Sequence, residues 1–245
     1  MTSKSLIIIP TYNEKENVSD IIDAVLAQDE RFNVLIIDDN SPDRTDLIVE
    51  EKIKSAFGRL HMIKRSGKLG LGTAYIEGFR YGIKYGFDYI FEMDADFSHD
   101  PKDLIRLLNA CEIDGADMSI GSRYVKGGGL KDWPFDRKLL SMMASLYVRI
   151  ITFMPVKDPT AGFKCYSVKV LKTLQLDKIK FIGYAFQIEM KYASYLNGFK
   201  IKEIPIIFKD REKGQSKMSS HIISEAIKGV LYMRLNALKG YYGKG

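Results

Sequence analysis

Residues 89–96 read Tyr-Ile-Phe-Glu-Met-Asp-Ala-Asp, a largely apolar run that ends in two aspartates separated by one alanine. A short run of this kind, rich in β-branched and aromatic side chains, predicts a buried strand. The same arrangement occurs twice earlier in the chain: the apolar run 6–9 ends at Pro10, and the apolar run 34–37 ends at Asp38. Each predicted strand therefore leads directly into polar residues.

Between and after these runs, apolar residues recur at helical spacing, which predicts amphipathic helices. The predicted helices cover residues 17–26, 47–53, 73–85 and 102–111, and two weaker strands are predicted at 61–64 and 118–120. Alternating strands and helices with short connections are typical of an α/β fold with a mostly parallel central sheet covered by helices. Because ligands of such sheets bind beyond the carboxyl ends of the strands, the polar strand ends predict one shared site there.

The composition fits a globular protein with a sizeable core. The chain has 245 residues, with 46% hydrophobic and 28% charged, which excludes disordered, collagen-like and disulfide-rich classes. Its two cysteines, Cys111 and Cys165, indicate a reducing compartment. The run after Met1 is too short for a signal peptide, and no segment approaches the roughly 18 apolar residues of a membrane span. A cytoplasmic location is therefore expected.

The formal charge of +6 leaves two interpretations open. It is compatible with an anionic partner such as nucleotide phosphates or lipid headgroups, and equally with a positive balance that only aids solubility. Lysines and arginines occur without interleaved aromatic residues, so nucleic acid is not an expected partner.

The pattern changes after about residue 125. The glycines 127–129 predict a flexible loop that acts as a simple linker. A helix with a broad apolar face is predicted at 139–154, and a strand at 201–208 is interrupted by Pro205, which indicates an edge position. A basic loop at 209–218 precedes a terminal amphipathic helix at 222–238. Two placements of the apolar helices stay open, against the protein core or in the headgroup region of a membrane.

The acidic pair carries the most specific chemistry. Asp94 and Asp96 follow a buried strand at a turn, so both carboxylates can reach one Mg²⁺ or Mn²⁺ ion that also binds a diphosphate. A solvated turn is the alternative. The carboxylates that end the second strand can accept hydrogen bonds from a nucleobase or ribose, or can cap the following helix.

Other candidate chemistries are weaker. The glycine-rich segment 67–73 matches neither the phosphate-loop nor the dinucleotide-binding spacing, which disfavours kinases and dehydrogenases, although Arg65 and Lys68 place positive charge near a helix start. Three scattered histidines do not suit a zinc site, and Cys165 has no base beside it.

Seven short motifs occur in order along the chain. They are Pro10-Thr11-Tyr12-Asn13-Glu14, Asp38-Asp39-x-Ser41-Pro42-Asp43-x-Thr45, Leu69-Gly70-Leu71-Gly72-Thr73-Ala74-Tyr75, Asp94-Ala95-Asp96-x-Ser98-His99, Gly121-Ser122-Arg123-Tyr124, Asp158-x-Thr160-x-Gly162-Phe163 and Arg211-x-x-x-Gly214-x-Ser216-Lys217. Together they resemble the family 2 glycosyltransferases, and within them the polyprenol monophosphomannose (dolichyl-phosphate mannose) synthases. The resemblance extends from about residue 5 to about residue 220.

The resemblance implies a GT-A fold in a single catalytic domain over residues 1–245, with a nucleotide-sugar-binding half to about residue 125 and an acceptor-binding half beyond it. It implies transfer of mannose from GDP-mannose to a polyprenyl phosphate, assisted by Mg²⁺ or Mn²⁺, with inversion at the anomeric carbon. Two alternatives stay open: a family 2 enzyme that uses UDP-glucose or UDP-N-acetylglucosamine with a lipid or saccharide acceptor, and a non-catalytic nucleotide-sugar-binding subunit.

The resemblance also assigns roles to individual residues. The donor-binding residues implied are Pro10, Tyr12, Glu14, Ile37, Asp39, Ala95 and Arg211. The metal ligands implied are Asp94, Asp96 and Ser98. The catalytic residues implied are Asp94, Asp96, Arg123 and Lys217. Relatives often have arginine where this chain has Lys164, and because lysine is a point charge and not a bidentate fork, a phosphate-binding role is not assigned there.

The acceptor chemistry explains why no catalytic base stands out. A phosphomonoester has a second pKa of about 6 and is largely dianionic at pH 7, so it attacks without a base. A saccharide acceptor would need one, and Glu189 is then the candidate. A lipid acceptor implies peripheral association with the cytoplasmic face of a membrane, with a small membrane subunit as a further candidate partner.

Overall fold

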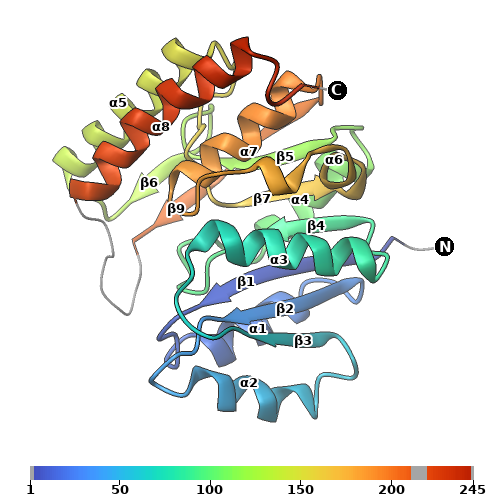
Figure 1. The fold of residues 1–245 in the computed structure, drawn as a ribbon. Helices are drawn as coiled ribbons and strands as arrows, with labels where there is room; N and C mark the ends of the chain where they lie inside the picture. Colours follow the sequence, from blue (N-terminus) through green and yellow to red (C-terminus); the bar gives the residue numbers. More distant parts are fainter. Residues whose placement is uncertain (1–2, 211–219, 244–245) are drawn as a thin grey trace.

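The computed structural model describes residues 3–210 and 220–243 and is built around a seven-stranded sheet (Figure 1). The strands lie in the order β3-β2-β1-β4-β7-β5-β8, and all neighbouring pairs are parallel except those of β7. The strands of this sheet are β1 (Ser5–Thr11), β2 (Phe32–Asp38), β3 (Leu60–Lys64), β4 (Tyr89–Glu92), β5 (Met118–Ser122), β7 (Lys164–Ser167) and β8 (Ile201–Pro205). The predicted mostly parallel α/β sheet is confirmed.

Helices cover both faces of this sheet. They are α1 (Val18–Leu26), α2 (Thr45–Ile53), α3 (Leu71–Lys84), α4 (Asp103–Glu112), α5 (Phe135–Thr152), α6 (Val168–Thr173), α7 (Ala185–Leu196) and α8 (Ser220–Leu238). Because successive side chains of a strand point to opposite faces, Leu6 and Ile8 of β1 pack with α3 and α7, while Ile7 and Ile9 pack with α1 and α4. These two buried cores hold the sheet rigid beneath its polar edge.

The strand β7 was not predicted from the sequence. It runs antiparallel between β4 and β5, so that Glu92 lies opposite Lys164 and Phe91 opposite Cys165. Because of this reversed direction, the loop that precedes β7 arrives at the same edge of the sheet as the carboxyl ends of β1, β2, β4 and β5. Residues 158–163 therefore join the predicted shared site.

The prediction of a simple linker at residues 127–129 is wrong. Gly129 begins β6 (Gly129–Lys131), which pairs in parallel with β9 (Ile207–Lys209) in a small second sheet. A Cβ atom on Gly128 would lie 2.5 Å from the carbonyl oxygen of Ser122, so the close approach of two backbones requires glycine here.

The predicted strand 201–208 is divided in two. β8 ends at Pro205, which has no N–H to continue a ladder, and β9 begins at Ile207. β8 lies at the edge of the large sheet, as Pro205 indicated.

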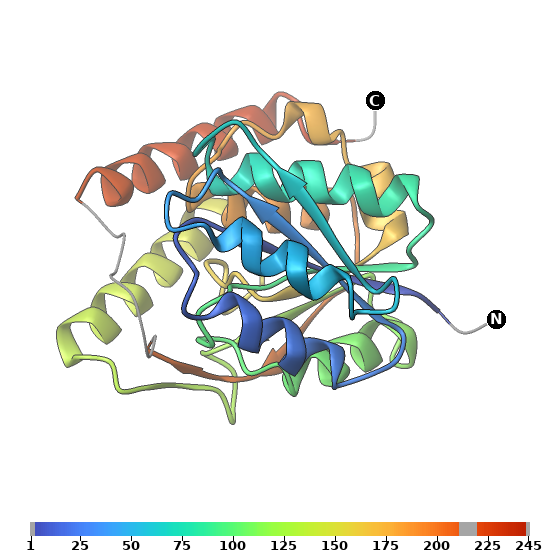
Figure 2. The same ribbon diagram turned by 90° about the horizontal axis from the view of Figure 1, so that it is seen from below.

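The helices α5 and α8 lie side by side, at the margin of the molecule opposite α2 (Figures 1 and 2). The hydroxyl of Tyr147 in α5 donates to the carbonyl of Ile227 in α8 at 3.0 Å, and the guanidinium of Arg234 lies 5.0 Å from the ring centre of Phe153. Both contacts join residues about 80 positions apart, so the two helices run in the same direction. Within residues 3–210 and 220–243, no helix is both long and apolar enough to span a bilayer.

Candidate functional site

The backbone at the ends of β1 and β2 is fixed by the buried carboxylate of Asp38. Its Oδ2 accepts hydrogen bonds from the hydroxyls of Thr11 at 2.8 Å and Ser41 at 2.6 Å, and its Oδ1 accepts from the Ser41 N–H at 2.9 Å. The Ser41 hydroxyl also accepts from the N–H of Asn13 at 3.0 Å. Asp38 is thus a structural residue that shapes both turns carrying predicted donor-binding residues.

Next to it, Asp39 forms a nearly buried ion pair with Arg65. The Arg65 Nε lies 3.1 Å from the Asp39 Oδ1, and the Arg65 Nη2 donates to the Thr73 hydroxyl at 2.7 Å. Burial raises the pKa of Asp39, and the neighbouring guanidinium counteracts part of that rise. The Lys68 ammonium lies 4.9 Å from the ring centre of Tyr12, so two cations accompany the predicted donor residues of this region.

The remaining predicted donor residues at these strand ends lie on the same two segments. Pro10 lies opposite Ile37 in the register of β1 and β2, and Ile37 is fully buried. The Glu14 carboxylate accepts from the side-chain amide of Asn17 at 3.0 Å, and the backbone N–H of Glu14 donates to the Thr45 hydroxyl at 3.1 Å.

The acidic pair lies in the loop that follows β4. The N–H of Asp94 donates to Nδ1 of His99 at 3.3 Å, and the Asp96 Oδ1 accepts from the N–H of Ser98 at 3.1 Å. Ala95 between them is buried. The loop is therefore bent back on itself by its own short-range hydrogen bonds.

The sequence alone assigns no function to His99, which occurs there only as part of a motif. It is buried, its ring stacks on Phe163 with 4.8 Å between ring centres, and it meets the ring of Phe208 edge-on at 5.3 Å. Burial lowers the pKa of His99 to about 4, so the neutral ring accepts the hydrogen bond from Asp94 at neutral pH.

The donor set at this loop fits a divalent cation. Asp94 and Asp96 supply carboxylates, and the buried Ser98 hydroxyl has no hydrogen-bond partner among the residues that the structure describes. Within the part of the chain that the structure describes, no group of three or more His, Cys, Asp or Glu side chains is arranged to hold a metal ion. Mg²⁺ and similar ions are commonly bound by one or two carboxylates and completed by substrate phosphates, so this set suits such an ion.

Arg123 follows β5 and is almost fully immobilised by Asp158. Its backbone N–H and Nε donate to the Asp158 Oδ2 at 2.9 and 2.7 Å, and its Nη2 donates to the Asp158 Oδ1 at 2.6 Å and to the Thr160 hydroxyl at 2.7 Å. Burial alone would raise the pKa of Asp158, but Arg123 outweighs it and holds that pKa below its usual value. The result is a buried, oriented guanidinium.

Several contacts connect Arg123 with the acidic loop. The Arg123 guanidinium lies 5.6 Å from the ring centre of Phe208, which also contacts His99. A Cβ atom on Gly162 would lie 3.7 Å from the His99 ring and 4.0 Å from the Asp94 Oδ2, so Gly162 lies beside both. The Lys209 N–H donates to the Ser98 carbonyl at 3.3 Å. The predicted residues Arg211 and Lys217 lie outside the described residues.

Glu189 in α7 is fully buried and already engaged. Its Oε2 accepts from the N–H groups of Lys180 at 2.9 Å and Phe181 at 3.0 Å, and its Oε1 accepts from the Tyr242 hydroxyl at 2.7 Å. These bonds anchor a loop and the C-terminal segment, which is a structural role.

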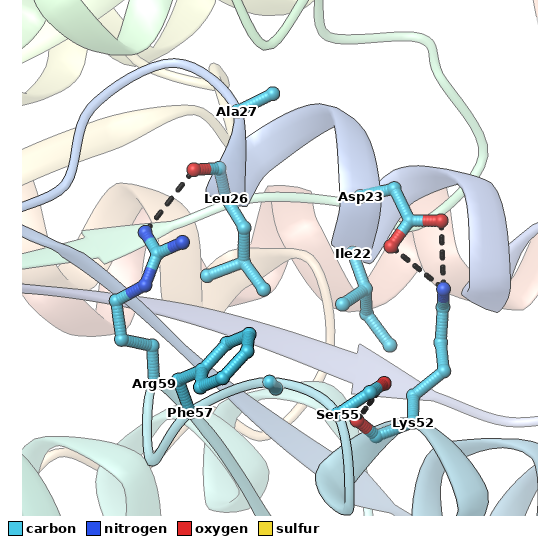
Figure 3. Close-up of a pocket in the computed structure, with 9 residues that line it drawn as sticks. Ile22, Asp23, Leu26, Ala27, Lys52, Ser55, Phe57 and Arg59 are labelled. Atoms are coloured by element: carbon cyan, nitrogen blue, oxygen red, sulfur yellow. Dashed lines mark hydrogen bonds and ion pairs between the residues drawn. The ribbon is translucent and has the colours of Figure 1, made fainter.

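One surface pocket lies at the opposite edge of the sheet, where α1 and α2 end (Figure 3). Its Lys52 is paired with Asp23 at 2.6 Å, and its Arg59 donates to the Leu26 carbonyl at 3.1 Å. None of the predicted site residues lines it. The candidate site is instead the polar edge formed by the ends of β1, β2, β4 and β5.

Known proteins resemble this chain at two levels. The solved structures of glucosyl-3-phosphoglycerate synthase from Mycobacterium tuberculosis share its fold, and the complex with Mn²⁺, UDP-glucose and phosphoglyceric acid superposes with a TM-score of 0.70 at 14% identity, covering 95% of this chain and 80% of that one. This likeness confirms the expected GT-A fold.

The sequence comparisons are more specific. Polyprenol monophosphomannose synthase from Mycolicibacterium smegmatis is 42% identical over 92% of this chain and 85% of its own length. Undecaprenyl-phosphate mannosyltransferase from Micrococcus luteus is 42% identical over 92% of this chain and 91% of its own length. Residues 6–175 match the family described as glycosyl transferase family 2. The chain therefore belongs to glycosyl transferase family 2.

Proposed function

We propose that this protein transfers mannose from GDP-mannose to a polyprenyl phosphate. The observation that carries the proposal is that one edge of the sheet brings two carboxylates, Asp94 and Asp96, together with the oriented guanidinium of Arg123. A diphosphate donor and a phosphate acceptor need these two kinds of charge at one place. Two relatives at 42% identity are named for mannosyl transfer to polyprenyl phosphates, which supports the same reaction here.

The donor half extends to about residue 125. Tyr12, Glu14 and Asp39 would contact the nucleoside, next to Pro10 and Ile37 near the ends of β1 and β2. The Asp39 carboxylate can accept from the N–H groups of guanine, with Arg65 beside it and Lys68 beside Tyr12. We therefore assign nucleotide recognition to the ends of β1 and β2.

A divalent ion, Mg²⁺ or Mn²⁺, would be held by Asp94 and Asp96, with the Ser98 hydroxyl near and Ala95 beside the diphosphate. When bound, such an ion supplies charge that stabilises the departing diphosphate. The contribution of the protein is to hold both carboxylates in a fixed loop through His99 and the Ser98 N–H.

The lipid phosphate would bind at Arg123, next to the acceptor half that begins at about residue 126. A phosphate oxygen attacks C1 of mannose, the bond between C1 and the GDP oxygen breaks with its electron pair, and the configuration at C1 inverts. The dianionic phosphate needs no base. Glu189, the base candidate for a saccharide acceptor, is fully occupied by hydrogen bonds, which favours the phosphate acceptor. Arg211 and Lys217 are proposed as further phosphate contacts.

The test is a transfer assay with GDP-mannose labelled in the sugar and polyprenyl phosphate, scored as lipid-extractable label. We expect product with Mg²⁺ or Mn²⁺ and none with EDTA. UDP-glucose and UDP-N-acetylglucosamine are parallel donors, and preferential transfer from either would overturn the assignment of GDP-mannose. Binding of donor without transfer to any acceptor would instead indicate a non-catalytic subunit.

Within this assay, Asp96→Ala should lower turnover by at least about a thousandfold, because a metal ligand stabilises charge that develops only in the transition state. Asp100→Asn is the matched control, since Asp100 lies in the same loop and its carboxylate accepts a local hydrogen bond from the N–H of Lys102 at 3.0 Å. Near-normal turnover of the Asp96 variant would refute the metal assignment.

We further propose that α5 and α8 rest on the cytoplasmic face of a membrane. Apolar side chains that are about half exposed line one stripe on each helix. They are Leu139, Met143, Leu146 and Ile150 on α5 and Ile227, Leu231, Leu235 and Leu238 on α8. The exposed Arg149, Lys228 and Lys239 and the half-buried Lys138, on these helices or beside them, suit anionic headgroups. Two adjacent parallel helices with this pattern match the surface that a lipid acceptor requires.

Co-sedimentation with vesicles that contain anionic lipid tests this surface. Leu146→Asp combined with Ile150→Asp should release most of the protein into the supernatant, because two charges enter the apolar stripe. Ile113→Asp is the control, since Ile113 is 72% exposed but lies beyond the end of α4. If the wild-type protein stays in the supernatant, direct lipid binding is wrong and a membrane subunit must recruit the chain.

A further inference from the structure

The segment 157–161, which connects α5 to β7, is held in place by other elements. It has no regular secondary structure. The N–H groups of Lys157 and Asp158 donate to the Glu203 carboxylate of β8 at 2.8 and 3.0 Å. Because buried backbone groups need partners, a segment of this kind depends on side chains that reach it from elsewhere.

The carbonyl groups of the same segment are satisfied by Lys191 of α7, which is fully buried. Its Nζ lies 3.0 Å from the Pro159 oxygen, 2.6 Å from the Ala161 oxygen and 3.0 Å from the Gln187 oxygen in its own helix. Three carbonyl oxygens match the three donors of an ammonium group. Burial and the nearby Lys164 lower the pKa of Lys191 while Asp158 opposes them. The ammonium form donates to all three carbonyls, and a neutral amine would keep two donors for them.

What this segment carries is Asp158, whose carboxylate orients Arg123. The backbone N–H, Nε and Nη2 of Arg123 all donate to the Asp158 and Thr160 side chains of the segment. A shift of the segment would therefore move the guanidinium with it. Lys191 does not contact Arg123 through these bonds; it binds the backbone carbonyls on both sides of Thr160, in the segment that holds Arg123.

We propose that Lys191 is a positioning residue, which fixes the segment 157–161 from behind so that Asp158 presents Arg123 to the phosphate of the acceptor. The inference rests on the proposed phosphate-binding role of Arg123. A buried lysine is costly where an apolar side chain would fill the same space, which indicates that the three hydrogen bonds and not the packing explain its presence.

Hydrogen exchange of the purified protein tests the positioning step without any substrate. In Lys191→Met, amide exchange should rise in residues 157–161 and 121–124, because the segment and the Arg123 backbone lose their anchor. Ser194→Ala is the matched control: Ser194 is also buried in α7, but its hydroxyl donates to the Met190 carbonyl at 2.8 Å and does not touch the segment. Equal exchange in both variants would overturn the proposal.

Transfer kinetics test the link to Arg123. Lys191→Met should lower kcat/KM for polyprenyl phosphate by about tenfold to a hundredfold, with KM for the nucleotide sugar nearly unchanged, since small misplacements of a binding group cost this much. In an Arg123→Ala background, Lys191→Met should cause little further loss. Additive losses would show that Lys191 acts by another route and would overturn the proposal.

A second variant covers the case in which Lys191→Met does not fold. Glu203→Gln weakens the other anchor of the segment at a half-buried position and should give a smaller change of the same kind, which Arg123→Ala again suppresses. A loss that persists in the Arg123→Ala background would contradict the proposal. If the wild-type protein transfers no mannose at all, the proposed function fails, while the exchange experiment still decides whether Lys191 fixes the segment.

Discussion

Two regions of the candidate site are held in place by different kinds of contact. At the ends of β1 and β2, the turns are held by partners from the same two strand ends: Ser41, three residues along the chain, donates twice to Asp38, and Thr11 on the adjacent strand donates once. At β7, the segment 157–161 is held by Glu203 and Lys191, which come from elements more than 25 residues further along the chain.

The two regions also differ in the kind of interaction. Hydroxyls and backbone N–H groups surround the Asp38 carboxylate, and that region contains one nearly buried ion pair, Asp39–Arg65. The β7 region contains more buried charges: the pair Lys164–Glu92, the pair Arg123–Asp158, and Lys191. Losing one of several uncharged donors to a carboxylate costs about 1–3 kcal/mol. Buried charges are tolerated only while each keeps its partner. The β7 region should therefore be much more sensitive to the loss of a single group.

The largest expected effect follows from Lys164→Met. The Lys164 Nζ lies 2.9 Å from the Glu92 Oε1, and both side chains are fully buried. Removing the ammonium leaves an uncompensated carboxylate, which should lower the free energy of unfolding by about 3–5 kcal/mol. Urea denaturation followed by circular dichroism measures the loss.

The matched control replaces both charges. Combining Lys164→Met with Glu92→Gln removes the net charge and keeps an acceptor for the Tyr166 hydroxyl, which donates to the Glu92 Oε1 at 2.7 Å. This double variant should regain most of the stability. If it is as unstable as Lys164→Met alone, packing and not charge balance explains the β7 region.

This contrast explains what sequence reasoning could find. Asp38, Asp94 and Asp96 follow apolar runs, and each has a hydrogen-bond partner within five residues, namely Ser41, His99 and Ser98, so both the strands and their polar ends could be read from local patterns. The strand β7 has only four residues, and its Lys164 breaks the apolar pattern because Glu92 on a neighbouring strand compensates the charge. A local pattern contains no information about such a partner.

The same limit applies to the site residues. Arg123 was predicted from a motif, but its orientation depends on Asp158, 35 positions away. The motif around Asp158 was visible in the sequence, and its order among the other motifs was the available signal for its presence at the site. For Lys191 and Glu203 no local signal exists, since a lysine in a helix and a glutamate in an edge strand are ordinarily solvent-exposed.

The pH dependence of stability tests the buried His99, which lies in the acidic loop. Burial lowers the pKa of His99 from 6.5 to about 4. Below pH 6.5 the unfolded chain binds a proton that the folded protein does not accept until about pH 4, so stability is lost as the pH falls through this window. The difference between the two pKa values corresponds to a loss of about 3 kcal/mol in the free energy of unfolding once the pH is below both values.

Unfolding free energies measured in EDTA at several pH values check this expectation. His99→Asn is the comparison, because the Asn oxygen can still accept the Asp94 N–H while the variant cannot bind the proton. The wild-type protein should lose more stability than the variant between pH 6.5 and pH 4. Parallel curves would show that His99 does not account for the pH dependence.

The smallest expected effect comes from the ends of β1 and β2. Ser41→Ala removes the hydroxyl that donates to Asp38 at 2.6 Å and accepts from the Asn13 N–H at 3.0 Å. The Ser41 N–H and the Thr11 hydroxyl still bind Asp38, so the expected loss is only about 1–2 kcal/mol. Ser55→Ala, at an exposed serine beyond α2, should change stability by less than about 0.5 kcal/mol. Hydrogen exchange in Ser41→Ala should rise in residues 11–14 and 38–45 and stay unchanged in residues 157–161. A rise in both places would mean that the two regions open together, and the site would then not consist of two separately held regions.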